Sequence, residues 1–429
     1  MTDKRFSIVT EPKTGQRIYT CVHPTGVRIA VMPMPAFTTG YAVFSTKYGS
    51  LDRSFRTNGE EVTVPDGIAH FLEHKLFENE DCDAFAQYAQ TGADANAGTG
   101  FAATSYVFSA ATEGFLPSLR ILLSFVQAPY FTDASVAKEQ GIIGQEINMY
   151  LDNPQWRVMF NALGGLYHDH PIKVDIAGTR ESISHITPQL LYQCYNTFYH
   201  PSNMQIVVCA AVEPEEVLAL CDELLQAKPP VTLERVCPQE PAEAAEEFVC
   251  RRMSVARPLF QIFTKDADVP CTGEALVRKT LELEVLTEIM FGRSSEFYTR
   301  LYEEGLIDGS FDVSQLCYES CSAVGIGGST DDPRRVYGEY LACIDRFREN
   351  GIPEAEFSRI RKAVFGKWLR LYNDPQQVAY LLLSLLQNDC VGFDLFGALE
   401  AMTPQSLHRR LTRVFAPGRH CCSVVEPLA

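Results

Sequence analysis

His70, Glu73 and His74 have the residue types and the spacing of a metal-dependent hydrolytic site. Residues four apart lie one turn apart on the same face of a helix, so both imidazoles can bind one Zn²⁺ ion through neutral ring nitrogens. Glu73 directly precedes the second histidine, where its carboxylate can reach the water that such an ion activates. The alternative is an amphipathic helix with two ordinary polar histidines near a core, but a glutamate buried between them would need a compensating charge.

The residues around this pattern predict the helix that carries it. Asp66 is the candidate N-cap, with Pro65 just before it and Gly67 just after it. A stripe of apolar residues at helical spacing is expected to lie opposite the two histidines: Ile68, Phe71, Leu72 and Leu76. The order H-x-x-E-H is the reverse of the commoner zinc-peptidase motif and is typical of the inverzincins.

A catalytic zinc site needs a third protein ligand and one open position for water. The pattern at residues 133–151 predicts a helix that begins near Asp133 and stops at residues 152–154, where a proline follows. Glu139 and Glu146 lie seven apart and therefore on nearly the same face of this helix. One of them could bind the metal while the other holds a histidine in its tautomer. The alternative is a pair of ordinary surface glutamates on an amphipathic helix.

Together these residues resemble the insulinase/pitrilysin family of zinc peptidases, which includes the mitochondrial processing peptidase. The shared pattern is H-x-x-E-H, followed about seventy residues later by the second of two glutamates seven apart. The similarity extends over essentially the whole chain and is closest to the bacterial two-domain YmfH-type branch. Further matching residues are 92–97, Thr99, Thr104, Tyr106, 175–179 and 194–204.

The resemblance implies a role for each site residue. The implied ligands of one Zn²⁺ per chain are His70, His74 and Glu146. Glu73 is then the general base, and Glu139 orients a metal ligand. The strand around Asn96 and Ala97 is implied to bind the peptide substrate as an added β-strand, a recognised mode of peptide capture. The implied activity is that of a zinc-dependent endopeptidase, which cleaves short or unfolded peptides inside an enclosed cavity.

The composition agrees with a globular enzyme of more than one domain. The chain has 429 residues, of which 46% are hydrophobic and 11% aromatic, and such a length exceeds one ordinary core. No apolar run approaches transmembrane length, and residues 1–5 open into polar sequence without a hydrophobic signal region. A cytoplasmic location is therefore expected. The 14 cysteines are scattered without a C-x-x-C pair, so reduced, mostly buried thiols are expected.

The chain is strongly acidic, with a formal net charge of −17. This charge argues against nucleic acid or an anionic membrane surface as a partner. It would suit cationic or amphipathic peptides if the acidic residues lined the substrate site. The alternative is a diffusely acidic surface that keeps the protein in solution.

An internal duplication predicts two similar halves. Residues 133–155 match residues 354–376 at a constant offset of 221, and later segments match at an offset of 216. We expect a zinc-binding catalytic half at 1–227, a linker at 228–245, and a similar half at 246–429 that walls the substrate cavity. The clearest extended segments are residues 28–32, 41–46 and 205–211. The fold class is then α+β, each half being a largely antiparallel sheet packed against helices. The resemblance implies the processing-peptidase/LuxS-like metallohydrolase fold.

The second half lacks the chemistry of the first half. Lys367 stands at the position of Glu146 and Ile360 at the position of Glu139, so no metal is expected there, because a lysine repels a cation. Family members that act alone carry in this half an Arg followed seven residues later by a Tyr, and residues 294–308 lack this pair. Losing such donors costs on the order of 3 kcal/mol in the reaction barrier. We therefore expect a related second chain to supply the Arg and Tyr, with a homodimer as the alternative.

Two other functions stay open at this stage. The first is a non-catalytic scaffold or maturation-associated protein of the same fold, although members in that role commonly lose metal ligands that are intact here. The second is a metal hydrolase that acts on a small non-peptide substrate. A small closed pocket would favour this second alternative.

Overall fold

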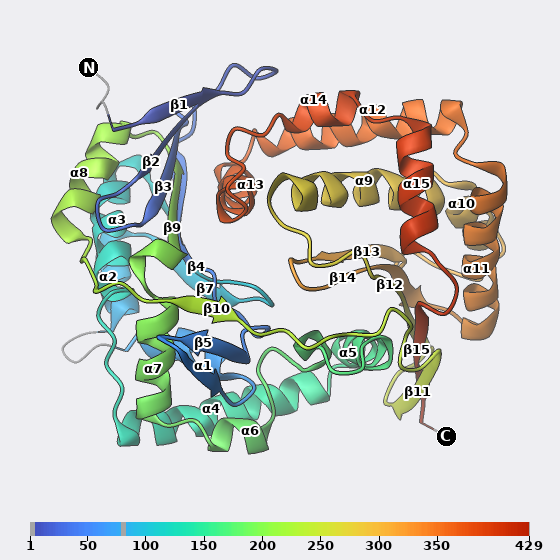
Figure 1. Ribbon diagram of the computed structural model, residues 1–429, viewed down its shortest axis with the longest axis horizontal. Coiled ribbons are helices and arrows are strands. Elements are labelled where there is room, and N and C mark those ends of the chain that lie inside the picture. Colours follow the sequence, from blue (N-terminus) through green and yellow to red (C-terminus); the bar gives the residue numbers. More distant parts are fainter. Residues whose placement is uncertain (1–4, 79–82, 429) are drawn as a thin grey trace. The chain divides into compact units, whose positions relative to one another are not determined.

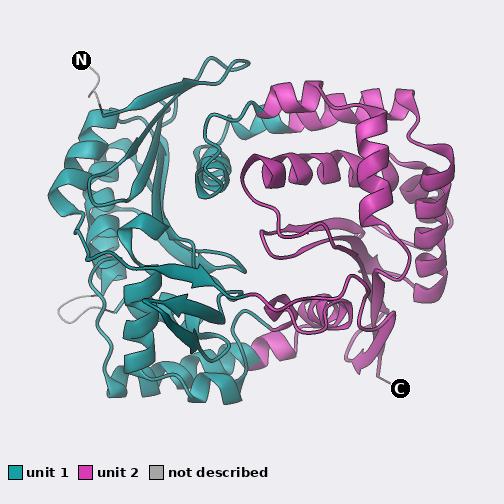
Figure 2. Ribbon diagram, viewed as in Figure 1, with its two compact units in different colours: residues 1–147, 175–236, 368–394 teal, residues 148–174, 237–367, 395–429 magenta. Residues whose placement is uncertain are grey.

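The structure, a computed structural model that describes residues 5–78 and 83–428, contains two compact units. Both units are discontinuous in sequence (Figure 2). Unit 1 comprises residues 1–147, 175–236 and 368–394, and unit 2 comprises residues 148–174, 237–367 and 395–429.

Unit 1 contains a seven-stranded sheet in the order β1-β2-β3-β9-β4-β8-β7 (Figure 1). Its strands are β1 (Ser7–Thr10), β2 (Arg17–Val22), β3 (Arg28–Pro33), β4 (Thr39–Thr46), β7 (Asp94–Thr99), β8 (Thr104–Ala111) and β9 (Met204–Ala210). Neighbouring strands are antiparallel except for β3 and β9. The three extended segments expected from the sequence are thus confirmed as β3, β4 and β9, and β7 lies at one edge of the sheet.

Helices cover both faces of this sheet. On one face α3 lies against β8 and β4, and Phe115 contacts Phe108 with ring centroids 5.0 Å apart. On the other face α13 lies against β9 and β4, and the hydroxyls of Tyr41 and Tyr380 are 3.1 Å apart. Unit 1 contains the helices α1 (Ile68–Leu76), α2 (Ala84–Thr91), α3 (Thr112–Phe125), most of α4 (Asp133–Leu151), α6 (Arg180–Ser184), α7 (Pro188–Phe198), α8 (Pro214–Leu224) and α13 (Pro375–Gln387).

A small three-stranded sheet accompanies the large one in unit 1. Its order is β10-β5-β6, with β5 at Ser54–Thr57, β6 at Glu60–Thr63 and β10 at Leu233–Arg235. β10 lies within the segment 228–245, for which the sequence predicts a linker. This segment is therefore partly ordered by strand pairing with β5.

Unit 2 contains a five-stranded sheet in the order β11-β15-β12-β14-β13 (Figure 1). Its strands are β11 (Phe248–Met253), β12 (Leu259–Asp266), β13 (Asp312–Cys317), β14 (Ser322–Ser329) and β15 (His420–Pro427), and only β11 and β15 are parallel neighbours. Its helices are α5 (Pro154–Leu166), α9 (Gly273–Phe291), α10 (Glu296–Glu303), α11 (Pro333–Asn350), α12 (Glu354–Leu371, continuing into unit 1), α14 (Leu395–Glu400) and α15 (Pro404–Val414). The α+β class with largely antiparallel sheets is confirmed in both units.

The internal duplication is visible in the helices. Asn153 and Asp374, 221 residues apart, are the N-caps of α5 and α13, and each side chain accepts a hydrogen bond from the backbone of the first turn. Thr187 and Thr403, 216 residues apart, cap α7 and α15 in the same way. The repeat is therefore a repeat of elements as well as of sequence.

The two units exchange one helix each, which the continuous ranges 1–227 and 246–429 did not anticipate. Helix α5 follows α4 in the chain but packs against β15 and β12 of unit 2, where a Cβ on Gly165 would lie 2.5 Å from the Cys421 sulfur. Helix α13 follows α12 but packs against β9 and β4 of unit 1. Each helix buries its apolar residues against the sheet on which it packs.

Two further observations concern composition. Most of the described cysteines are buried free thiols, as in the apolar packing expected for them. Within the described ranges, none of the helices combines the length and the apolar character needed to cross a bilayer.

Replacing Leu382 by Ala tests the contribution of the exchanged helix α13 to unit 1. Leu382 is 1% exposed, and removing such a side chain costs about 2–5 kcal/mol in the free energy of unfolding. Leu151→Ala is the matched control, since Leu151 is 48% exposed and its loss should cost little. Chemical denaturation followed by circular dichroism measures both variants. Equal midpoints for the two would contradict the packing of α13 on the unit 1 sheet.

Candidate metal centre

Helix α1 begins at a glycine that no other residue could replace without strain. Gly67 is the N-cap and has a left-handed backbone with φ +90°. A Cβ on Gly67 would lie 2.4 Å from the Ala177 carbonyl oxygen, and a Cβ on Gly178 would lie 2.5 Å from that of Asp66. The backbones at 66–67 and 177–178 therefore touch, which places the family-like stretch 175–179 against the start of the helix.

The expected capping role of Asp66 is wrong. The helix has no side-chain cap, and the Asp66 carboxylate lies 3.5 Å from Arg53. The Asp66 carbonyl oxygen accepts a hydrogen bond of 2.8 Å from the Ser182 hydroxyl. Gly67 is the N-cap instead. Its backbone lies against residues 177 and 178, which are more than a hundred positions away in the chain.

The apolar stripe on α1 is confirmed. Ile68, Phe71, Leu72 and Leu76 are each at most 3% exposed. Burying such side chains contributes about 1.5–3 kcal/mol each. The stripe holds the opposite face in place, and on that face His70 and Glu73 are each only 8% exposed.

Helix α4 brings two carboxylates to the same place. It spans Asp133–Leu151, the range that the sequence predicts, and its buried residues include Val136, Ile143 and Ile147. Glu139 is 4% exposed, so the alternative of two ordinary surface glutamates is excluded for that residue.

The imidazoles of His70 and His74 and the carboxylate of Glu146 converge. Their possible ligand atoms all lie within 4.8 Å of one another, and these three residues form the one such group found among the described residues. Nε2 of His70 and Nε2 of His74 each lie 3.6 Å from an oxygen of Glu146. All three residues belong to unit 1.

The donor set fits Zn²⁺. Two neutral imidazoles and one carboxylate are a typical set of protein ligands for a catalytic zinc, which leaves a fourth position open. Ligand atoms of a tetrahedral site with bonds of about 2.0 Å are roughly 3.3 Å apart, and the observed 3.6 Å is close to that value. Small side-chain adjustments would bring all three atoms to bonding distance of one ion.

Glu139 orients one of the two imidazoles. Its Oε1 lies 3.0 Å from Nδ1 of His74, so the ring turns Nε2 towards Glu146. Burial lowers the pKa of His74, but the bond to Glu139 and the charges of Glu73, Glu139 and Glu146 outweigh it, and the pKa of His74 is raised. The carboxylates around the His74 imidazole thus favour a positive charge on or beside the ring, which either a proton or a metal ion can provide.

His70 has the opposite electrostatic environment. Burial, aided by the neighbouring His74, lowers the pKa of His70 to about 4. The imidazole is therefore neutral near pH 7, which is the form that binds a metal.

Glu73 points to the end of the edge strand β7. Thr99, the last residue of β7, donates a hydrogen bond of 2.6 Å from its hydroxyl to Oε2 of Glu73. Burial raises the pKa of Glu73, and the Thr99 hydrogen bond opposes that rise. The residue type of Thr99 alone predicts no role; its only signal in the sequence is its place among the residues that resemble the family.

Asn96 and Ala97 lie on the same edge strand, three and two residues before Thr99. β7 pairs with β8 on one side and is the last strand of its sheet among the described residues. Side chains alternate along a strand, so Ala97 shares the Glu73 face with Thr99, whereas Asn96 is on the other face. The Asn96 side chain accepts a hydrogen bond of 2.8 Å from the Ala97 amide, which shows that this amide is on the free edge.

Comparisons with known proteins identify the family of the chain. The family model "Insulinase (Peptidase family M16)" matches residues 60–180, and the model "Peptidase M16 inactive domain" matches residues 185–364. The chain is 40% identical over 408 residues to a Bacillus subtilis protein named "Uncharacterized zinc protease YmfH", which covers 93% of this chain and 94% of that protein.

Solved structures show the same fold. The chain matches the crystal structure of an M16-like peptidase from Alicyclobacillus acidocaldarius with a TM-score of 0.94 and 34% identity, covering 98% of this chain and 100% of that one. It matches pitrilysin with a TM-score of 0.74 and 15% identity, covering 99% of this chain and 46% of pitrilysin. The second similarity concerns the fold alone.

Gly67→Ala tests whether the close backbone approach positions the metal ligands. A left-handed backbone costs a residue other than glycine about 1–2 kcal/mol, and here the clash with Ala177 adds to that cost. The matched control is Gly59→Ala, because Gly59 has φ +87° but open space around its Cβ position. Thermal unfolding and zinc affinity measure both variants.

We expect Gly67→Ala to lower stability more than the control and to weaken zinc binding, which the control should leave unchanged. The same zinc affinity in both variants would show that the approach at 66–67 and 177–178 does not position the histidines.

Proposed function

Because the chain belongs to the insulinase family of peptidases (peptidase family M16), we propose that it is a zinc-dependent endopeptidase that cleaves short or unfolded peptides. One observation supports this proposal above the others. Glu73 directly precedes His74 of the His70, His74 and Glu146 cluster on α1, and its carboxylate accepts a hydrogen bond from Thr99, the last residue of β7. A metal site, a proton acceptor and a strand edge that can take a peptide are therefore adjacent.

Two helices would provide the metal ligands and the residue that orients one of them. His70 and His74 from α1 and Glu146 from α4 would hold one Zn²⁺ per chain, and Glu139 would keep His74 in the orientation that presents Nε2. When bound, the ion would polarise the peptide carbonyl and lower the pKa of water at the site. Loss of an orienting group such as Glu139 typically weakens metal binding 10- to 100-fold.

Glu73 would act as the general base. Its carboxylate would accept a proton from the water that attacks the peptide carbonyl, and would then give a proton to the amine that leaves. Burial raises the pKa of Glu73 in the direction of neutral pH, which is favourable for a group that must both accept and release a proton.

The peptide would bind along the free edge of β7. An extended peptide added to a sheet edge forms main-chain hydrogen bonds with little regard to sequence, and pockets for alternate side chains provide selectivity. Ala97 would present backbone groups to it, and Asn96 would have to release the Ala97 amide for pairing. This mode of binding favours unfolded or short peptides, because only an extended segment can join a strand.

A second, related chain would complete the catalytic machinery. In the segment where an Arg and a Tyr would be expected, Asp308 stands at the place of the Tyr, and its carboxylate lies 2.8 Å from Arg257. Partial burial raises the pKa of Asp308, but hydrogen bonds from Ser310 and Ser329 and the charge of Arg257 lower it to about 2. Asp308 is thus ionised near pH 7 and paired with Arg257, and a homodimer of this chain would not supply the missing Tyr.

We place the protein in the cytoplasm. Buried free cysteines dominate among its described thiols, and such thiols persist in reducing compartments.

Glu73→Gln separates catalysis from metal binding. The amide is isosteric but cannot accept the proton, so peptide cleavage should fall by about 10²–10⁴-fold while the zinc content stays at that of the wild-type protein. Mass spectrometry of a digested peptide mixture measures cleavage, and elemental analysis measures zinc. Glu61→Gln on the exposed strand β6 is the control. Full cleavage by Glu73→Gln would contradict the proposal. A wild-type protein that binds zinc without cleaving any peptide would favour the alternative function, a non-catalytic scaffold protein of the same fold.

The need for a second chain can be tested by size-exclusion chromatography and peptidase assays. We expect a complex with a related chain that carries the Arg and Tyr. The complex should be about 10²–10³-fold more active than the isolated protein, the range found when donors that stabilise the transition state are restored. Full activity of the isolated chain would contradict this part of the proposal.

A further inference from the structure

We propose that Thr99 is a positioning residue, whose hydroxyl holds the Glu73 carboxylate in the orientation needed for proton transfer and couples it to the strand that receives the peptide. This inference rests on the proposed role of Glu73 as general base. It assigns to Thr99 a part in the rate of the chemical step and no part in metal binding.

The first support is the hydrogen bond itself. The Thr99 hydroxyl lies 2.6 Å from Oε2 of Glu73, a short distance that is typical of a hydroxyl bonded to an ionised carboxylate. Thr99 is the one described residue whose side chain donates a hydrogen bond to this carboxylate. The Glu73 side chain is 8% exposed, so water has little room to replace the donor.

The second support is the rigid position of Thr99. It stands directly opposite Thr104 in the β7–β8 pair, and the two hydroxyl oxygens are 3.3 Å apart. Thr104 is fully buried and donates a hydrogen bond of 2.9 Å to the Tyr48 carbonyl oxygen. Each hydroxyl has one hydrogen, and that of Thr104 is donated to Tyr48, so Thr104 holds the Thr99 side chain by contact and leaves the Thr99 hydrogen for Glu73.

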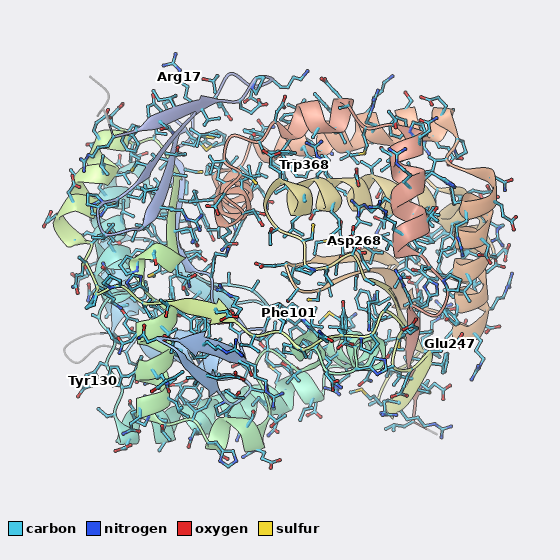
Figure 3. All side chains as sticks on the ribbon, viewed as in Figure 1. Arg17, Phe101, Tyr130, Glu247, Asp268 and Trp368 are labelled. Carbon is cyan, nitrogen blue, oxygen red and sulfur yellow. The ribbon has the colours of Figure 1, made fainter. Side chains whose placement is uncertain are left out.

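The turn that follows Thr99 is also held in place. Its first residue, Gly100, donates a backbone hydrogen bond of 2.8 Å to Ala103, and the carbonyl of Phe101 accepts one of 2.9 Å from Leu51. Phe101, labelled in Figure 3, is 5% exposed. A Cβ on Gly49 would lie 2.3 Å from the Phe101 carbonyl oxygen. The end of β7 is thus held against the loop around Gly49. The Thr99 hydroxyl therefore has a defined position from which it can orient the Glu73 carboxylate.

The location of Thr99 connects the substrate to the base. Thr99 ends the strand whose free edge would bind the peptide, and the same residue contacts the group that would move the proton. A peptide paired with β7 would therefore be in a defined register relative to Glu73. Correct positioning of this kind raises the rate of the chemical step more than the affinity for the peptide, because the peptide would bind through main-chain hydrogen bonds to β7.

The alternative is that Thr99 only stabilises the β7–β8 turn. Valine has the shape of threonine and favours strands at least as well, so Thr99→Val would preserve a purely structural role. Thr99→Ser keeps the hydroxyl and loses only the methyl group. The two variants therefore separate the hydrogen bond of the hydroxyl from the packing, and both keep the Thr99 backbone amide, which also donates to Glu73.

The experiment measures kcat, KM and zinc content for the wild-type protein, Thr99→Val, Thr99→Ser, Glu73→Gln and a remote control, each assayed with the second chain if activity requires it. Thr20→Val on β2 is the control, because Thr20 donates only a long hydrogen bond to Ser7 far along the sheet. We expect Thr99→Val to lower kcat roughly 10- to 100-fold, the range for a hydrogen bond to a charged group. KM and zinc content should stay close to the wild-type values, and Thr99→Ser should recover most of kcat.

Equal kcat for Thr99→Val and wild type would overturn the inference, as would a Thr99→Ser variant as slow as Thr99→Val. Either result with an inactive Glu73→Gln variant would leave the proposed function intact, whereas an active Glu73→Gln variant would reject the proposed function itself. A crystal structure of Thr99→Val gives a measurement that needs no activity. The Glu73 carboxylate should have moved from its wild-type position, and an unchanged position would contradict the inference.

Discussion

The contact of one carboxylate with two imidazoles is the interaction on which the proposed zinc site depends. Glu146 on α4 lies 3.6 Å from a ring nitrogen of His70 and from one of His74 on α1. Without this contact the histidines would be two polar residues on a mostly buried helix, and Glu146 would be a surface glutamate. The rest of unit 1 can be understood as the means of holding α1 and α4 at this distance. The apolar stripe fixes the rotation of α1, and the glycine at its start fixes its position along the axis.

Two support residues give this contact its chemical character. Glu139 turns His74 so that its free nitrogen faces Glu146, and Thr99 turns Glu73 towards the end of the edge strand. In the proposed mechanism Glu139 would serve the metal site and Thr99 would serve proton transfer. Because Thr99 also belongs to the strand that would receive a peptide, Glu73 would connect the position of the substrate to the proposed proton transfer.

Local patterns were predictable from the sequence, whereas contacts between distant segments were not. The face shared by His70 and His74 and the face shared by Glu139 and Glu146 follow from helix periodicity alone. That α4 faces α1 followed only from the family resemblance. Asp66 was the wrong N-cap because the start of α1 is decided by a backbone contact with Gly178, which no local rule describes. The exchange of α5 and α13 was missed for a similar reason, since an amphipathic helix shows that it needs a sheet but not which sheet.

The most direct test of the central claim is a crystal structure of the zinc-loaded protein with anomalous diffraction measured at the zinc absorption edge. We predict one anomalous peak per chain, with bonds of about 2.0–2.2 Å to a ring nitrogen of His70, a ring nitrogen of His74 and an oxygen of Glu146. A peak elsewhere, or a peak on the two histidines with Glu146 turned away from it, would contradict the account.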